Sequence, residues 1–521
     1  MVQYRIFSEN EWVYPDTPLT GDNTVLLHTP RGADVCFQVL TDHPLAEESF
    51  SASWTGLDSI TPEFYQLMGA CVDENSHAKA LTTLDYDSVK DFVTRRAPFT
   101  VYDMTRPLDD GRLVPDFASD KAAFYIRLNV PADAEPGRYN GTVTLHTGEE
   151  TLVLPVAVQV YNTTVPPLEA SDFHMINWLY YDRLAADHHT EIMTPAYREI
   201  LLAYFANQLD MRNDYLMIPG GVPVRDAHGQ VTDFDFSHAA YVGNLALEAG
   251  FKYILGGFVA RFEKWDDPEQ LLLWDRTVDV SSLEGYRQLK LYFTRAWECV
   301  IANGWEKQYM QCLVDEPQFP NSQSYRALSG ICRSRMPGVK IHDPVETTEI
   351  GGALDIWVVK QAVFEKYLDK YQALQAMGEE MWLYTCGFPA GKTMNRVMDL
   401  PLTVSRLPFW MCVLYDCPGF LHWGYHCHNA ERERATCYRA GDNIKYPAGN
   451  AHVVYPADGR PWYSVRGHLQ RAGAMDAQLF MMLPPAEAKA LIREVCTSFD
   501  DYDPSAAALE DVRIRLLERL G

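Results

Sequence analysis

"YMQCLVDEPQFPNSQSYRALSGICRSRMPGVKIHDPVE", residues 309–346, contains a strand, a helix and a second strand in that order. Residues 309–316 are a short apolar run that ends in two acids, and Pro317 stops it. Residues 322–336 carry apolar side chains at the helical spacing of three and four, and residues 339–346 read as a second strand. Because a helix between two strands brings those strands side by side in parallel, the stretch predicts an α/β fold.

The same order repeats from about residue 170. Eight strands are expected, at 172–181, 215–221, 253–261, 309–316, 339–346, 354–361, 381–388 and 419–426, with amphipathic helices such as 194–212 and 281–304 between most of them. Eight such units over roughly 280 residues are typical of a (β/α)8 barrel. The connection at 347–353 is too short for a helix, so the count could be wrong by one. A doubly wound open sheet is the competitor, but no G-x-G-x-x-G turn follows the first strand.

The N-terminal third has a different pattern of apolar runs and turn residues. Short alternating runs separated by Gly, Pro and Asp predict β-structure, and 130–167 reads as a hairpin followed by a linker. Only 86–96 has a helical pattern of some length. We therefore predict a β-sandwich domain at 1–167, the catalytic barrel at 168–483, and a C-terminal helical segment at 484–521 that packs on the barrel.

Composition limits the class of protein. Of 521 residues, 47% are hydrophobic and 22% are charged, and no run approaches the roughly 20 apolar residues that cross a bilayer. The excess of 70 acidic over 45 basic residues, a net charge of −25, argues against a nucleic-acid partner. The N-terminus lacks a signal-peptide pattern and the 11 cysteines are scattered, so we expect a cytoplasmic protein without a membrane partner.

Asp315 and Glu316 are the leading catalytic candidates. In a barrel the reactive groups stand at the C-terminal ends of the strands, which is where this pair falls. Neighbouring carboxylates repel, which tends to raise the pKa of one of them, and a general acid needs a raised pKa at neutral pH. An Asp-Glu-Pro surface turn is the alternative.

Other residues at predicted strand ends are polar or aromatic. These candidates for substrate contact are Asn177, Trp178, Arg261, His342 with Asp343, and Tyr384. Aromatics make up 12% of the chain, which is compatible with stacking on a sugar ring but also with core packing.

The stretch PGFLHWGYHCHN, residues 418–429, permits two interpretations. His422, His426, Cys427 and His428 are of the types that bind zinc, but no acidic partner or Cys-x-x-Cys spacing accompanies them, so we predict no metal and no cofactor. The other interpretation is a last barrel strand whose Trp423 and Tyr425 form an aromatic wall.

Several segments in the right order resemble glycoside hydrolase family 123 and its wider relatives. They are VDEP at 314–317, and the stretches 382–410, 416–428 and 453–480, preceded by the hairpin at 130–145. The resemblance covers nearly the whole chain, from sandwich through barrel.

The resemblance implies a retaining exo-β-N-acetylgalactosaminidase that uses substrate-assisted catalysis. In that mechanism the 2-acetamido oxygen of the sugar attacks the anomeric carbon and forms an oxazolinium intermediate. If the roles of the family's residues are carried over to this chain, Asp315 would accept the acetamido N–H. Glu316 would protonate the glycosidic oxygen and then activate water. The expected partner is an oligosaccharide or glycoconjugate, and the sequence leaves a homo-oligomer open.

One segment departs from the family pattern. Relatives usually show a stretch like S-I-R-x-E-x-x-R-D-G-x-E-D-Y, whereas residues 464–479 read SVRGHLQRAGAMDAQL. Ser464, Arg466, Arg471, Gly473 and Asp476 remain, and the replacements are His468, Ala472, Met475 and Ala477. The change is local repacking if the helix only supports the fold, and a change of substrate if its acids support the pocket.

Three other functions stay open at this stage. The first is a glycosidase of the same architecture with a different sugar, which fits an adjacent pair poorly because two-carboxylate enzymes place their acids about 5 Å or more apart across the bond. The others are a non-catalytic carbohydrate-binding protein and metal-dependent hydrolysis at 422–428.

Overall fold

The computed structural model describes residues 2–21, 23–116, 119–265, 267–427, 438–439, 444–457 and 459–521. The chain forms two compact units. The first unit comprises Met1–Phe173, Gly387–Tyr415 and Gly424–Gly521, and the barrel unit comprises His174–Cys386 and Asp416–Trp423.

Two sheets dominate the first unit. The seven-stranded sheet has the order β1 (Tyr4–Ser8), β3 (Ala33–Pro44), β10 (Lys121–Val130), β5 (Thr61–Val72), β8 (Phe99–Pro107), β28 (Arg460–Ser464), β27 (Val454–Ala457). The five-stranded sheet has the order β2 (Val25–Arg31), β12 (Glu150–Thr164), β11 (Gly137–Thr147), β4 (Glu48–Thr55), β9 (Arg112–Leu113).

The two sheets contribute to one hydrophobic core. Every second residue of β12 is buried from Leu152 to Val160, as expected for a strand with one apolar face. These side chains form a cluster with Phe37, Val39 and Phe124 of the other sheet. The predicted hairpin is confirmed as the antiparallel pair β11–β12, in register from Gly137 opposite Val160 to Thr147 opposite Glu150.

The helix expected at 86–96 is reduced to a 3-10 turn at Tyr86–Ser88. The backbone N–H of Thr94 donates to the carbonyl of Asp399 at 2.7 Å rather than to the carbonyl four residues before it. A contact 305 residues away in the sequence therefore replaces the helical hydrogen bond.

The barrel unit contains eight parallel strands. Their order is β13 (His174–Asn177), β24 (Gly419–His422), β23 (Glu380–Thr385), β22 (Ile356–Lys360), β21 (Lys340–Val345), β20 (Tyr309–Gln311), β17 (Tyr253–Gly256), β14 (Tyr215–Met217). The open edges approach one another: the N–H of Asp214, just before β14, donates to the carbonyl of Met175 in β13 at 3.2 Å. The result is a nearly closed barrel with its strands in the predicted sequence order.

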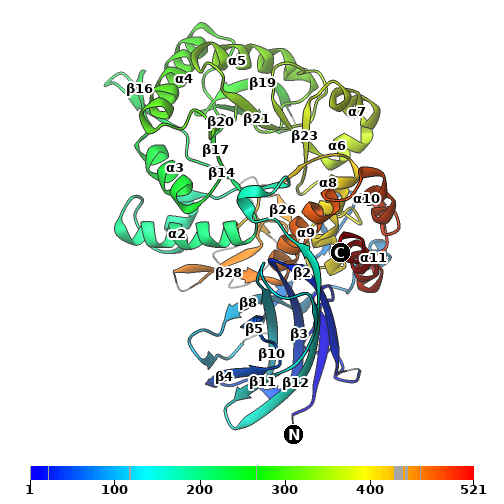
Figure 1. Ribbon diagram of the computed structural model, residues 1–521. Helices are drawn as coiled ribbons and strands as arrows, with labels where there is room; N and C mark the ends of the chain where they lie inside the picture. The colour runs from blue at the N-terminus through cyan, green and yellow to red at the C-terminus, as the bar shows by residue number, and fades with distance from the viewer. Residues whose placement is uncertain are drawn as a thin grey trace. The chain divides into compact units, whose positions relative to one another are not determined.

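Helices lie outside these strands (Figure 1). They are α1 (Tyr181–Asp187), α2 (Pro195–Asp210), α3 (Ser237–Ala249), α4 (Leu283–Asn303), α5 (Ser322–Arg335), α6 (Gln361–Lys366) and α7 (Leu368–Ala376). Thr194 and Ser282 cap α2 and α4 by accepting backbone N–H groups of the first turn. Residues 346–355 form turns instead of a helix, as the short connection predicted, and the count of eight strands stands.

The chain after the barrel returns to the first unit, which differs from the boundaries we predicted. Strand β28 pairs with β8, where Tyr463 lies opposite Thr105. The first unit also holds α8 (Leu407–Leu414), α9 (Val465–Met481), α10 (Pro485–Ile492) and α11 (Ala506–Leu520). Helix α11 contacts β2 and β12, because the apolar stripe of α11 covers that edge of the five-stranded sheet.

Small two-stranded ribbons complete the fold. They are β15 (Val222–Arg225) with β16 (Val231–Asp235), β18 (Ala260–Lys264) with β19 (Asp267–Leu273), β6 (Asn75–Ser76) with β7 (Thr82–Thr83), β25 (Tyr438–Arg439) with β26 (Lys445–Tyr446), and β29 (Cys496–Ser498) with β30 (Asp501–Tyr502). Within the described ranges, no helix has the length and apolar character that crossing a membrane requires.

Candidate active site

Asp315 and Glu316 lie just beyond the C-terminal end of β20. The backbone of Glu316 has φ +56°, a left-handed conformation that is uncommon for a residue with a side chain. Its N–H donates to the carbonyl of Pro344 at 3.1 Å, and the N–H of Glu346 donates to the carbonyl of Pro317 at 3.0 Å. The chain thus turns sharply at Glu316 and is tied to the end of β21. The strict alternation of an extended strand does not continue through the pair.

Asp343 supports the chain that leads to the pair. This fully buried carboxyl group, whose pKa burial raises well above its usual range, accepts the N–H of Leu313 at 2.8 Å and the N–H of Val314 at 3.4 Å. It also accepts the hydroxyl of Tyr325 from α5 at 2.7 Å. Asp343 therefore does not face a substrate; it anchors the two residues that precede Asp315.

Three side chains from neighbouring strands surround Glu316. Tyr384 of β23 donates its hydroxyl to Glu316 Oε1. Lys360, the last residue of β22, places Nζ 3.7 Å from the same oxygen and 2.5 Å from Glu346 Oε1. All of them stand at strand C-terminal ends, where barrel enzymes carry their chemistry.

Burial dominates the electrostatics of the pair. Burial raises the pKa of Asp315 well above its usual range, and the Glu316 carboxylate adds to the rise, while Lys360 and Arg261 oppose it. Burial also raises the pKa of Glu316, with Lys360 opposing and Glu346 adding to the rise. A carboxyl whose pKa is raised in this way can hold a proton for transfer at neutral pH.

Asp315 differs from Glu316 in its hydrogen bonding. Across the described ranges, no protein group donates a hydrogen bond to the Asp315 carboxylate. The positive charges of Lys360 and, to a lesser extent, Arg261 of β18 act on it. The Asp315 carboxyl group therefore has acceptor capacity left for a donor from a ligand.

Two of the predicted aromatic contacts also follow barrel strands. Trp178 comes directly after β13 and packs edge-on against Phe258, with ring centroids 5.4 Å apart. Its indole N–H is buried and has no hydrogen-bond partner in the described part of the chain. Trp423 comes directly after β24, is only partly buried, and stacks on His422.

Three predicted contacts are placed elsewhere. Asn177 is fully buried and donates to Asn213 Oδ1 at 2.9 Å. The prediction that His342 ends its strand is wrong: β21 continues for three more residues, so His342 lies inside the barrel. Burial lowers the pKa of His342 to about 3. Tyr425 was predicted on the last barrel strand but belongs to the first unit, because β24 ends at His422. The carbonyl of Tyr425 accepts the N–H of Val453 at 2.9 Å, and the Tyr425 ring is fully buried.

Lys360 and Glu346 were missed by the sequence analysis. Lys360 has the signal that identified Asp315, since it follows the apolar run IWVV at a strand end, and Glu346 is the last residue of the predicted strand 339–346. A charged residue that closes a buried parallel strand is therefore as informative here as an adjacent pair.

The histidine-rich stretch is only partly described. His428 lies outside the described residues, while His422 ends β24 and His426 belongs to the first unit. Among the residues that the structure describes, no group of three or more His, Cys, Asp and Glu side chains is arranged to hold a metal ion.

The segment that departs from the family pattern is buried in the first unit. Arg466 forms a two-pronged ion pair with Asp103, at 2.8 and 3.0 Å, and donates to the carbonyls of Arg396, Gly449 and His452. His468 stacks between Tyr125 and Tyr463, with centroids 4.5 and 4.4 Å away. Helix α9 thus packs on the sheet of the first unit, which favours local repacking as the meaning of the replacements.

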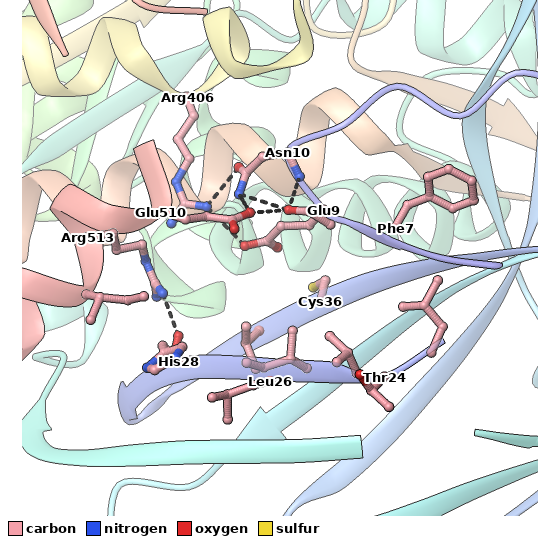
Figure 2. Close-up of a pocket in the computed structure, with 16 residues that line it drawn as sticks. Phe7, Glu9, Asn10, Thr24, Leu26, His28, Cys36, Arg406, Glu510 and Arg513 are labelled. Atoms are coloured by element: carbon pink, nitrogen blue, oxygen red, sulfur yellow. Dashed lines mark hydrogen bonds and ion pairs between the residues drawn. The ribbon is translucent and has the colours of Figure 1, made fainter. Parts of the chain in front are cut away.

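The first unit also contains a cavity of about 300 Å³ between β1, β2 and α11 (Figure 2). Its charged lining is internally paired: Arg406 contacts Glu9 at 3.0 Å, and Arg513 donates to the carbonyl of His28. Glu510 accepts from Asn10 at 3.0 Å and from Ser8. These contacts account for the charged groups that line the cavity.

Several solved structures are similar to this chain. A family 123 glycoside hydrolase from Clostridium perfringens, whose structure concerns glycolipid glycan hydrolysis, covers 100% of this chain and 97% of its own, with 12% identity and a TM-score of 0.74. An endo-β-1,4-mannanase from Thermotoga petrophila covers 59% of this chain and 78% of its own, with 12% identity and a TM-score of 0.38. A family 10 xylanase with a bacterial Ig-like domain from termite gut covers 88% of this chain and 100% of its own, with 10% identity and a TM-score of 0.37.

The first of these neighbours shares the fold, and the other two are too distant to carry an argument. No curated protein sequence matches the chain. The family model "Glycoside hydrolase 123, catalytic domain" matches residues 222–483, which are half of the chain and include the Asp315–Glu316 pair. The chain therefore belongs to glycoside hydrolase family 123.

Proposed function

We propose that the protein is a retaining exo-glycosidase that removes terminal β-linked N-acetylgalactosamine by substrate-assisted catalysis. The observation that supports this best is the difference between the two adjacent carboxyl groups. Glu316 is held by Tyr384 and Lys360, whereas Asp315 receives no hydrogen bond from the described residues. One group is thus set up for proton transfer and the other for accepting a donor.

The first step divides the work between the two acids. The carbonyl oxygen of the substrate's 2-acetamido group attacks the anomeric carbon as the glycosidic bond breaks. Glu316 gives its proton to the departing oxygen, and the aglycone leaves as an alcohol. Asp315 accepts the acetamido N–H, which holds the group under the ring and stabilises the positive charge of the oxazolinium ion.

The second step returns both groups to their starting state. Glu316, now a carboxylate, removes a proton from water as the water oxygen attacks the anomeric carbon. The bond to the acetamido oxygen breaks, and the product is the β-anomer of the free sugar. Glu316 is protonated again, so one residue serves as acid and then as base.

The surroundings of the pair agree with a sugar ligand. Trp178 has an indole N–H without a partner in the described ranges, and Trp423 is only partly buried, so both are proposed substrate contacts together with Arg261 and Tyr384. Glycolipid glycans belong in any substrate panel, because the Clostridium perfringens neighbour concerns their hydrolysis. We also propose that the two sheets of the first unit form a β-sandwich, as their shared core suggests.

A panel of aryl glycosides that differ at the 2-position and the 4-position tests this function. We expect hydrolysis of the β-N-acetylgalactosaminide and none of the matching β-galactoside. Preference for the galactoside would contradict the proposal and favour a different sugar. No hydrolysis of any member, with binding retained, would favour a carbohydrate-binding protein.

Two variants test the roles of the acids. Glu316→Gln should lower kcat about 10²- to 10⁴-fold on substrates with poor leaving groups and much less on a dinitrophenyl glycoside, which leaves without a proton. Asp315→Asn should slow both kinds of substrate. The exposed Asp369→Asn, on α7, is the matched control. A wild-type rate in either active-site variant would move the site elsewhere.

A further inference from the structure

We propose that Lys360 and Glu346 are positioning residues that act on Glu316 through a shared ammonium group, and this inference rests on the proposed function. Lys360 is placed to stabilise the carboxylate that appears when Glu316 gives up its proton. Glu346 holds the same ammonium group away from Glu316 before that step. Neither residue is required to touch the sugar.

The geometry favours a shared ammonium group over a simple ion pair. Lys360 Nζ lies 2.5 Å from Glu346 Oε1 but 3.7 Å from Glu316 Oε1. In the resting arrangement the lysine is therefore bonded to Glu346, and Glu316 is its second neighbour. Tyr384 donates to the same oxygen of Glu316, and the side chain of Glu346 also hydrogen-bonds to Glu316. The acid is therefore contacted by a neutral donor, a second carboxyl group and an incompletely engaged cation.

Burial makes these charges count. The side chains of Lys360, Glu316 and Glu346 are 14%, 15% and 17% exposed. Solvent screening of their interactions is consequently weak compared with that of surface pairs. Glu316 alternates between a neutral and a negative form during catalysis, so a cation within 4 Å changes the balance between the two forms.

The charged groups around the acid act in opposite directions. Besides Asp315 on the same loop, Glu316 is faced by Lys360 from β22, Glu346 after β21 and Tyr384 from β23. Lys360 opposes the rise in the pKa of Glu316, and Glu346 adds to it.

Two further groups, Cys386 and Arg261, act on the neighbours of Glu316 rather than on Glu316 itself. Burial works against the charge of Lys360, but the Cys386 thiol and the two carboxylates outweigh it and raise the pKa of the lysine. Arg261 from β18 opposes the rise in the pKa of Asp315.

These signs give an experiment that a purely structural role would not satisfy. The pH dependence of kcat/KM is measured on the aryl glycoside that the wild type hydrolyses. Lys360→Met should move the alkaline limb, where Glu316 loses its proton, up by about one pH unit, because the cation that favours the carboxylate is gone. Glu346→Gln should move the same limb down, because a negative charge is lost and Lys360 is freed to approach Glu316.

Conservative and distant variants serve as controls. Lys360→Arg keeps the charge and should leave the alkaline limb within a few tenths of a unit of the wild type. Lys340→Met, at the opposite end of β21, and Glu349→Gln, in the turn after β21, change exposed residues of the same types and should leave the profile unchanged. If Lys360→Met fails to fold, Lys360→Arg and Glu346→Gln still carry the test.

An infrared titration separates this inference from the proposed function, because it does not depend on turnover. The carboxyl band that disappears in Glu316→Gln reports the proton on Glu316. We expect its midpoint to rise in Lys360→Met and to fall in Glu346→Gln. Shifts in the same direction, or a loss of rate that is equal at every pH with no shift, would overturn the inference even if the enzyme is the proposed hexosaminidase.

Discussion

We predict that Asp343→Asn destabilises the protein and slows the reaction without removing any group that touches the substrate. Asp343 accepts two backbone N–H groups, from Leu313 and Val314, and the hydroxyl of Tyr325. Asparagine has the same shape but only one acceptor oxygen. Its amide group would face donors, so at least one of the three loses its partner.

The size of the effect follows from burial. Leu313 and Val314 are fully buried, so a backbone N–H that loses its acceptor cannot form a hydrogen bond with water instead. One unsatisfied buried donor costs about 1–3 kcal/mol, so we expect a loss of about 1–3 kcal/mol. The chain that carries Asp315 should shift as well, and a misplacement near 1 Å costs about 10²-fold in rate.

Urea unfolding and kcat on an aryl glycoside measure the two effects. Tyr325→Phe removes a single hydrogen bond to the same carboxylate and should cost only about 1 kcal/mol, which makes it the matched control. If Asp343→Asn unfolds at the wild-type urea concentration and keeps the wild-type kcat, the carboxylate does not hold this part of the chain and the reasoning fails.

Three further predictions concern stability. Burial raises the pKa of Glu316, so its ionisation costs stability above about pH 4.3. Glu316→Gln should therefore raise the free energy of unfolding by about 1 kcal/mol at pH 7 but not at pH 4, which is measured by thermal unfolding. Burial opposes ionisation of Asp476, but Arg406 and Arg513 outweigh it and lower the pKa of Asp476. The wild type should therefore lose stability below about pH 4. Asp476→Asn should be about 3–5 kcal/mol less stable than the wild type at pH 7, and this difference should shrink in acid. Gly473→Ala would place Cβ 2.5 Å from the Phe409 ring, so the free energy of unfolding in urea should fall by about 1–3 kcal/mol. An unfolding midpoint equal to that of the wild type would contradict each of the three predictions.

Local signals explain why the barrel strands were predictable. Each is an apolar run bounded by turn residues, and β-branched or aromatic side chains in runs of this length favour buried parallel strands. The caps of α2 and α4 are also local, since Thr194 with Pro195 and Ser282 stand directly before the helices that they begin.

Long-range contacts explain what the sequence analysis missed. Tyr463 of β28 lies opposite Thr105 of β8, and no pattern in either segment indicates the partner. The helix expected at 86–96 is broken by the carbonyl of Asp399, which is equally remote in sequence. The return of the chain to the first unit could therefore not be read from periodicity.

The candidate site was predicted in part for the same reasons. Asp315, Glu316 and Tyr384 stand at strand ends that apolar runs identify. His342 was misplaced because β21 runs on to Val345, and a limit that is wrong by three residues moves a side chain from the mouth of the barrel to its interior. The shared ammonium group could be found only from distances.

The most direct test of the central claim is a series of aryl β-N-acetylgalactosaminides whose acetyl group carries zero, one, two or three fluorine atoms. Fluorine withdraws electrons from the acetamido oxygen and makes it a poorer nucleophile, while the leaving group stays the same. If that oxygen attacks the anomeric carbon, kcat/KM must fall steeply with each fluorine, although Asp315 and Glu316 are unchanged. A rate that does not depend on fluorination would contradict substrate-assisted catalysis.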